Sequence, residues 1–220
     1  MTSETPEFEP TTAPQHALVP RDAATLVLVD GSLNCPRILM GRRHPDMAFL
    51  ADKFVFPGGR VDEADLTAHP GHDLNPAVTD KLLAGMAGVP SAARARALAI
   101  AAIREVREET GIVLGDPDRP PLEALSYFAR AITPPDRPRR YDTRFFIADA
   151  SLATVTALAG DGELSDLDWF TLDQTRHLDV PGITRLILKD VAEVLAERPT
   201  RSRPIPFYFH ADGRFHRELI

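Results

Sequence analysis

A helix that ends in a cluster of glutamates constrains this chain more than any other feature. The segment Ala99–Ile112 reads AIAAIREVREETGI, in which strong helix formers are followed by Gly111, a typical helix stop. Three carboxylates stand at positions i, i+3 and i+4 and therefore share one face of this helix: Glu105, Glu108 and Glu109. Like charges at this spacing repel each other, so the cluster requires a physical explanation.

Two interpretations of the acidic face are open. In the first, the face is solvated and Arg104 pairs with Glu108 at i+4. In the second, a divalent cation removes the repulsion and uses the carboxylates as hard oxygen ligands.

A longer pattern favours the second interpretation. The segment Arg104–Ile112, REVREETGI, resembles the second half of the Nudix box, R-E-U-x-E-E-x-G-U, where U is aliphatic, and every specified position matches. Upstream, Phe56–Asp62 reads FPGGRVD and is similar to the start of the box, where a strand runs into a Gly-Gly turn. Both halves occur in order, so the chain resembles the Nudix hydrolase family.

The two halves lie farther apart than in the usual box. Arg104 comes 45 positions after Gly59, which corresponds to an insertion of about 31 residues. Asp65 occupies the position of the first box glutamate. This spacing resembles the Nudix subgroup with a long insertion, which includes the peroxisomal coenzyme A diphosphatases.

The resemblance implies a fold, a reaction and a cofactor. The fold would be of the α/β class, a Nudix-type α/β/α sandwich with a mixed β-sheet. The reaction would be hydrolysis of a pyrophosphate bond in a nucleoside diphosphate linked to another group, with coenzyme A or acyl-coenzyme A favoured. The cofactor would be Mg²⁺ or Mn²⁺, since hard cations suit carboxylate ligands.

The same resemblance assigns roles to residues near the helix. The metal ligands would be the three glutamates and a backbone carbonyl: Glu105, Glu108, Glu109 and Gly58. Arg104 would hold a glutamate in place by a charge-assisted hydrogen bond. Glu105 is the first choice for the general base, and Glu163, in a loop before a later strand, is the second choice or a further ligand.

Arginines are the candidate substrate-binding residues, because guanidinium groups bind phosphates bidentately and stack on adenine. Two lie at the end of a predicted strand (Arg42, Arg43) and three flank Tyr141–Thr143 (Arg139, Arg140, Arg144). We favour Arg42 and Arg140, together with Gly59, whose backbone can approach a ligand closely. The alternative is that these arginines only balance an acidic surface.

Strand and helix signals alternate along the chain. Strands are expected at 24–30, 37–42, 53–56, 122–133, 141–148 and 164–172, and helices after Ser91 and over Ile183–Glu197. This order predicts a mixed sheet between helical layers. We expect a mobile tail over 1–21, a Nudix domain over 22–200, and a C-terminal extension over 201–220 with one short strand at Pro206–Phe209. The insertion, residues 66–90, is expected to be a lid or surface elaboration.

Composition limits the partners. The formal net charge of −7 argues against general nucleic-acid binding, and the chain contains no apolar run long enough to cross a membrane. A single cysteine excludes an internal disulfide and fits a reducing compartment, so we expect a cytoplasmic protein with a small nucleotide substrate. A homodimer remains open. The alternative to an enzyme is a non-catalytic Nudix-like domain that binds or senses a nucleotide.

Overall fold

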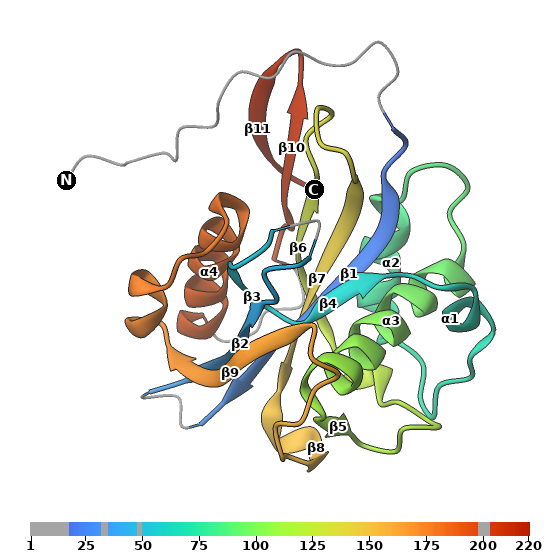
Figure 1. The fold of residues 1–220 in the computed structure, drawn as a ribbon. Coiled ribbons are helices and arrows are strands. Elements are labelled where there is room, and N and C mark those ends of the chain that lie inside the picture. The colour runs from blue at the N-terminus through green and yellow to red at the C-terminus, as the bar shows by residue number, and fades with distance from the viewer. Residues whose placement is uncertain (1–17, 32–34, 48–49, 198–202) are drawn as a thin grey trace.

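A large mixed β-sheet forms the centre of the protein in a computed structural model that describes residues 18–31, 35–47, 50–197 and 203–220 (Figure 1). The strand order is β11-β10-β6-β7-β1-β2-β3, with β4 added to β1 and β9 added to β2. The pairs β1–β7 and β6–β10 are parallel and the other pairs are antiparallel. The strands of this sheet are β1 (Arg21–Asp30), β2 (Arg37–Arg43), β3 (Phe54–Val55), β4 (Gly58–Arg60), β6 (Ser126–Ile132), β7 (Tyr141–Asp149), β9 (Leu164–Thr171), β10 (Pro206–Ala211) and β11 (Arg214–Leu219).

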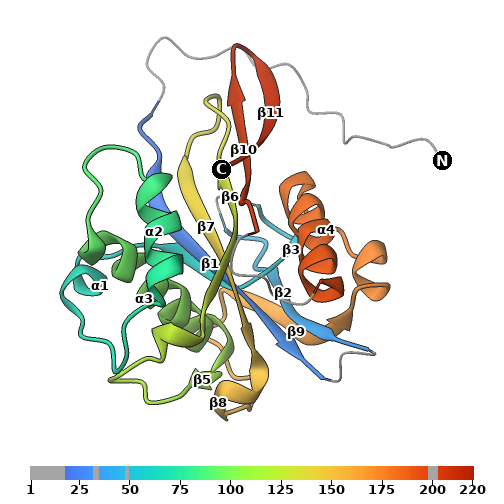
Figure 2. The ribbon, with the colours of Figure 1, turned by 180° about the vertical axis from the view of Figure 1, so that it is seen from behind.

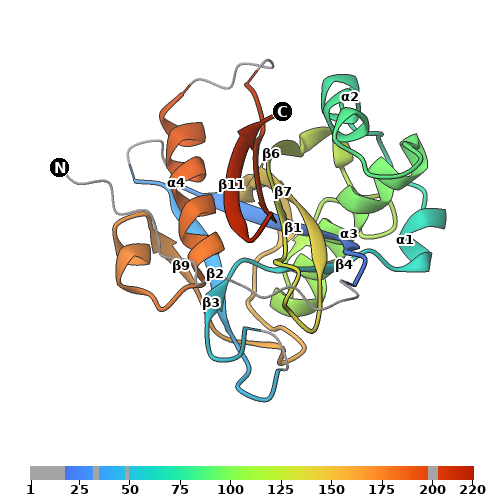
Figure 3. The ribbon, with the colours of Figure 1, turned by 90° about the horizontal axis from the view of Figure 1, so that it is seen from above.

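Helices cover both faces of this sheet (Figures 2 and 3). On one side lie α1 (Glu63–Thr67), α2 (Pro76–Ala84) and α3 (Ala92–Thr110), and on the other lies α4 (Gly182–Ala196). A small second sheet pairs β5 (Val113–Leu114) with β8 (Ala153–Val155), and short 3₁₀ turns are η1 (Leu122–Ala124), η2 (Ala150–Leu152) and η3 (Gln174–His177). The α/β/α sandwich with a mixed sheet that the sequence predicted is therefore confirmed.

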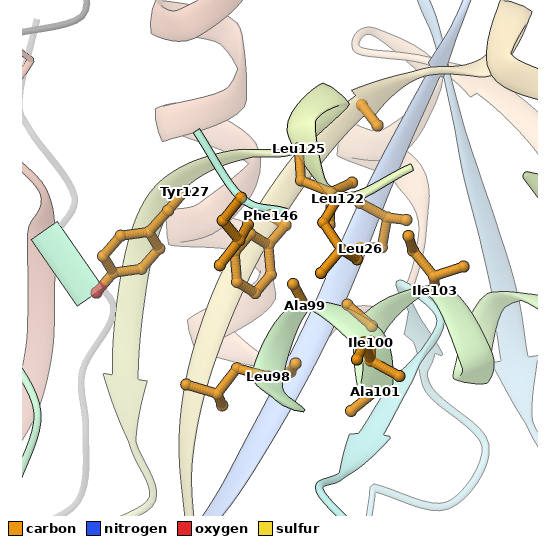
Figure 4. Packing of buried hydrophobic residues seen from close by; sticks show 14 of the residues in the cluster. Leu26, Leu98, Ala99, Ile100, Ala101, Ile103, Leu122, Leu125, Tyr127 and Phe146 are labelled. Carbon is orange, nitrogen blue, oxygen red and sulfur yellow. The ribbon is translucent and has the colours of Figure 1, made fainter. Parts of the chain in front are cut away.

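Side-chain alternation along the strands builds two cores. On β1, Leu26 faces α3 and Val27 faces α4, and both are fully buried. In Figure 4, Leu26 and Phe146 from the sheet meet α3, whose alanines allow the helix to approach closely. The sheet thus holds α3, which carries the glutamates, as a rigid element of the core.

Helix α3 begins and ends where the sequence predicted. The Ser91 hydroxyl accepts a hydrogen bond of 3.0 Å from the Arg94 amide, which caps the N-terminus. At the other end Gly111 adopts a left-handed conformation with φ of 76°, which a residue with a side chain resists.

The insertion contributes three side chains to the core, so the expectation that it is only a lid or surface elaboration is wrong. Leu74, Leu82 and Met86 are only 5%, 1% and 7% exposed and join the cluster between the sheet and α3. Arg130 in the sheet also donates a hydrogen bond of 2.5 Å to the carbonyl oxygen of Gly85. The apolar side chains of this segment therefore fill space that α3 and the sheet leave open.

The chain ends also differ from expectation. Most of the predicted tail, residues 1–17, lies outside the described residues, and Arg21 already begins β1. The C-terminal segment forms a hairpin of two strands instead of one short strand, and β10 joins the main sheet beside β6. The segment 150–162 contains η2 and β8. In the described part of the chain, no helix is both long and apolar enough to cross a membrane.

Candidate active site

The C-terminal half of α3 lies against the Gly-Gly turn that begins β4. Glu109 is 2% exposed, and its Oε2 accepts a hydrogen bond of 2.8 Å from the amide of Gly58. Next to it, a Cβ atom at Gly59 would overlap the carboxylate of Glu105. At Gly59 the Glu105 carboxylate therefore occupies the space that a side chain would need.

Arg104 is the centre of the hydrogen bonds on this helix face. Its Nε and Nη2 each donate to the carboxylate of Asp65 at 3.0 Å, and Nη1 donates to Glu105 at 2.7 Å and to Glu108 at 2.9 Å. Nη2 also reaches the carbonyl oxygen of Arg60 at 3.0 Å. Burial alone would lower the pKa of Arg104, but the bond to Asp65 and the charge of Glu105 raise it. Arg104 thus positions two of the predicted ligands.

A loop brings Glu163 close to the glutamates of α3, although it follows Glu109 by 54 positions in the sequence. The amides of Ala159 and Asp161 donate to the last carbonyls of α3, on Thr110 and Glu108, at 2.9 and 3.0 Å. These bonds satisfy helix-end acceptors that would otherwise lack partners. The Glu163 amide then donates to the Asp161 side chain at 2.9 Å, which places Glu163 beside the helix end.

Arg43 joins this group from β2. Its Nη1 lies 3.7 Å from Oε1 of Glu109, and its Nη2 lies 3.7 Å from Oε2 of Glu163. The side chain is 14% exposed. Of the two neighbouring candidates, Arg42 was favoured from the sequence, whereas the fold brings Arg43 to the carboxylates.

Arg42 points to the other face of the sheet. Successive side chains of a strand alternate, and Arg42 shares its face with Ile38 and Met40, which pack on the α4 side. Its guanidinium pairs with Asp52 and Asp166 at 3.2 and 3.0 Å. The alternation of buried residues along β2 was the sequence signal that could have separated the two arginines.

Arg140 is also used elsewhere. It donates to the carbonyl oxygens of Thr133 and Leu18 at 3.1 and 2.6 Å and so fixes the connection between β6 and β7. The described residues that Arg140 contacts include none of the glutamates at the end of α3. The roles predicted for Arg42 and Arg140 in substrate binding therefore stay predictions without a contact to this cluster.

The carboxylates repel one another in a poorly solvated place. Burial raises the pKa of Glu109 to about 8, and the charges of Glu105 and Glu163 add to this rise. Burial is also the main reason that the pKa of Glu105 is raised, with Glu108 and Glu163 contributing. A nearby cation favours the charged form of such groups.

The donor chemistry fits a hard divalent cation, although the ligands are not arranged around one. Among the described residues no three acidic or histidine side chains form a ready metal cluster. Glu105 and Glu108 instead bond to Arg104, while Glu109 bonds to the Gly58 amide and approaches Arg43. The structure shows this amide contact of Gly58, so the metal-binding role of its carbonyl stays a prediction.

Two hollows in the described surface do not contain the glutamates. One of about 540 Å³ is lined by residues of the segment 65–73 and by Arg96. The other, of about 580 Å³, lies between α2, the start of β6 and the end of α4. We therefore identify the candidate site by its side chains and not by either of these hollows.

Comparisons with known proteins concern the fold of this chain. A family model described as NUDIX domain matches residues 93–190. The structure is similar to a crystal structure of a NUDIX hydrolase from Alicyclobacillus acidocaldarius, with a TM-score of 0.59, 24% identity, and coverage of 81% of this chain and 96% of that one. A comparison with curated proteins gives no match.

Two further solved structures share the fold. The NUDIX domain of Shewanella oneidensis NrtR, in complex with ADP ribose, gives a TM-score of 0.52 at 13% identity, covering 81% of this chain and 90% of that one. The MutT NUDIX hydrolase from Burkholderia pseudomallei gives 0.50 at 20% identity, covering 79% and 99%. The family match over residues 93–190 and these similar structures together show that the chain shares the NUDIX fold.

Proposed function

We propose that this protein hydrolyses a pyrophosphate bond in a nucleoside diphosphate linked to another group, with Mg²⁺ or Mn²⁺ as cofactor. One observation carries the proposal. Glutamates from two distant segments, three on α3 and Glu163 before β9, gather near the glycine turn that begins β4. A purely structural helix would have no reason to keep these charges together in a poorly solvated place.

Each residue of the candidate site would have a separate role in this reaction. Glu105, Glu108, Glu109 and the carbonyl of Gly58 would hold the metal, which when bound neutralises phosphate charge and activates a water molecule. Arg104 orients Glu105 and Glu108 through hydrogen bonds of 2.7 and 2.9 Å. Glu105 is our choice for the general base, and Glu163 is the second choice. Gly59 stays a predicted substrate-binding residue, although the Glu105 carboxylate occupies the space beside its Cα in this structure.

Coenzyme A or an acyl-coenzyme A is the favoured substrate, on the basis of the long insertion between the two halves of the box. A small-molecule nucleotide is the expected partner, and a homodimer and a cytoplasmic location stay predictions. The NUDIX domain crystallised with ADP ribose makes this nucleotide sugar the first competitor.

A substrate panel tests the proposal. Purified protein with Mg²⁺ or Mn²⁺ is incubated with coenzyme A, ADP-ribose, NADH and dinucleoside polyphosphates, and products are identified by mass spectrometry. We expect metal-dependent cleavage between two phosphates. Tight binding of one compound without turnover would support the alternative, a nucleotide-sensing domain.

The coenzyme A preference has its own test. Coenzyme A carries a 3′-phosphate, and loss of a well-placed charged contact typically costs about 2–3 kcal/mol, roughly 30- to 150-fold in kcat/KM. Coenzyme A should therefore be cleaved more efficiently than its 3′-dephospho form. Equal kcat/KM values for the two would overturn the preference while leaving the reaction class intact.

A further inference from the structure

The candidate site contains two arginines that differ in how fully their donors are hydrogen-bonded. Arg104 donates to two carboxylates on α3, to Asp65 and to a backbone carbonyl. The Nε of Arg43, by contrast, is buried without a hydrogen-bond partner, and its two terminal nitrogens approach carboxylates only at 3.7 Å. Since N–H···O hydrogen bonds span about 2.7–3.2 Å, the donors of Arg43 are attracted but not satisfied.

The backbone of Arg43 is fixed although its guanidinium is not. Its amide donates to the carbonyl oxygen of Lys53 at 2.9 Å, and Arg43 pairs with Leu164 in the sheet. The following residue, His44, donates from its amide to the carbonyl oxygen of Glu163 at 2.9 Å. The guanidinium therefore stays beside Glu109 and Glu163 but can change partners by rotating its side chain.

The balance of charges at the site indicates a role for Arg43. Five carboxylates, those of Asp65, Glu105, Glu108, Glu109 and Glu163, meet at this end of α3, and Arg104 is already shared among three of them. Glu109 and Glu163 are left to Arg43. A divalent cation that binds these carboxylates would compete with Arg43 for the same oxygen atoms.

We propose that Arg43 is the resident counter-cation of the site. In the metal-free protein it neutralises Glu109 and Glu163. When a divalent cation takes its place, the guanidinium turns away from the carboxylates and donates to phosphate oxygens of the nucleotide. A guanidinium suits both partners, because carboxylate and phosphate accept the same bidentate pattern of donors. The second half of this proposal rests on the proposed function.

Competition predicts two effects of opposite sign. Removal of the Arg43 charge should tighten binding of the metal, because a competing cation is lost. The same change should weaken binding of a nucleoside diphosphate, because a phosphate donor is lost. General damage to the site would weaken both, so the opposite signs distinguish the proposed role from a structural one.

The experiment measures binding, without need of turnover. Mn²⁺ is titrated into the full-length protein with electron paramagnetic resonance detection, and ADP is then titrated into the Mn²⁺-loaded protein by calorimetry. The variants are Arg43→Gln, Arg43→Lys and, as a matched control on the same strand, Arg37→Gln, whose exposed side chain pairs with Asp30. Thermal unfolding of each variant confirms the fold.

We expect Mn²⁺ to bind Arg43→Gln about fivefold more tightly, and ADP to bind it roughly 30-fold more weakly. Arg43→Lys, which keeps the charge but not the bidentate geometry, should recover wild-type Mn²⁺ affinity and only part of the ADP affinity. Arg37→Gln should match the wild type in both titrations. Unchanged or weaker Mn²⁺ binding in Arg43→Gln would overturn the counter-cation role, and unchanged ADP binding would overturn the phosphate role. Neither result depends on hydrolysis, so failure of the proposed reaction is detected separately by the substrate panel.

Discussion

Two clusters of charged side chains lie on the α3 side of the sheet, and they differ in the sign of their excess charge. The glutamate cluster at the end of α3 has an excess of acid, with Arg43 and Arg104 as its cations. A second group, which we call the buried arginine cluster, has an excess of base and consists of Arg94, Arg130, Arg144, Asp22 and Asp142. The two clusters differ in how fully their buried carboxylates are paired.

In the buried arginine cluster the carboxylates are saturated. Asp142 accepts from Arg130 in a bidentate pair at 2.8 and 2.7 Å and also contacts Arg144 at 2.8 Å. Arg94 forms a second bidentate pair, with Asp22. These bidentate pairs offset part of the desolvation of Asp142 and Asp22, although Nε and Nη2 of Arg144 lack hydrogen-bond partners.

The glutamate cluster lacks this saturation. Glu109 is as buried as Asp142 but receives one hydrogen bond, from the Gly58 amide, and a longer contact from Arg43. Its pKa is raised to about 8 mainly by burial, which means that the protein does not stabilise its charge fully. A buried carboxylate left in this condition is typical of a functional site.

The largest effect is expected from removing the segment that the buried arginine cluster holds. Replacing residues 66–90 by a short flexible linker removes Leu74, Leu82 and Met86 from the core and the carbonyl partner of Arg130. Each large apolar side chain lost from a core costs about 2–5 kcal/mol, so the sum approaches the total stability of a domain. We expect no cooperative unfolding transition by circular dichroism. A native melting curve would show that the segment is peripheral after all.

Asp142→Ala comes next and tests the buried arginine cluster directly. The change leaves Arg130 and Arg144 buried without their main counter-charge, which costs about 3–5 kcal/mol. Urea denaturation measures the free energy of unfolding. The control is Asp173→Ala, whose side chain is 82% exposed and should change stability by less than about 0.5 kcal/mol. Similar values for both variants would remove the structural role of the cluster.

Glu108→Gln in the glutamate cluster should lower turnover and leave stability almost unchanged, whereas Asp142→Ala lowers stability. The Glu108 side chain is 42% exposed and pairs with Arg104, so its charge adds little stability. As a predicted metal ligand it matters for turnover, and we expect a loss of at least about 100-fold, or about 2.7 kcal/mol. Rate and thermal midpoint are measured on the same preparation. Near-normal turnover would exclude Glu108 from the site.

The sequence predicted local features well because local chemistry determines them. Ser91 and Gly111 marked the ends of α3, and helical spacing placed Glu105, Glu108 and Glu109 on one face. These features depend on residues within one or two turns.

The errors concern long-range pairing. Arg42 and Arg43 are adjacent and chemically identical, and the alternation along β2 separates them only once it is known which face of the sheet α3 covers. The C-terminal hairpin depends on contact between β10 and β6, about 80 residues apart, which no local pattern reveals. The insertion was misread because its apolar residues are few and the space they fill is made by other elements.

The smallest effect is expected at the glycine turn. Substitution of Gly58 should affect stability, and substitution of the adjacent Gly59 should affect turnover. At Gly58 an added Cβ would overlap the backbone of Ala24 and Thr25 in the paired strand, and backbone atoms cannot yield without a local shift of the sheet. Gly58→Ala should therefore lower stability by about 1–3 kcal/mol. At Gly59 the three atoms nearest to an added Cβ all belong to the side chain of Glu105, which can move by rotating its own torsions.

Gly59→Ala should therefore leave the fold intact and displace the group that we assign as the base. A displaced catalytic group costs rate without stability, so we expect turnover to fall about 10-fold, or about 1.4 kcal/mol in the barrier, with an unchanged melting midpoint. The same measurements on Gly59→Ala and Gly58→Ala then compare two glycines that differ only in what lies opposite them. If Gly59→Ala lost stability but not rate, Glu105 would belong with the structural charges, and Glu163 would become the first choice for the base.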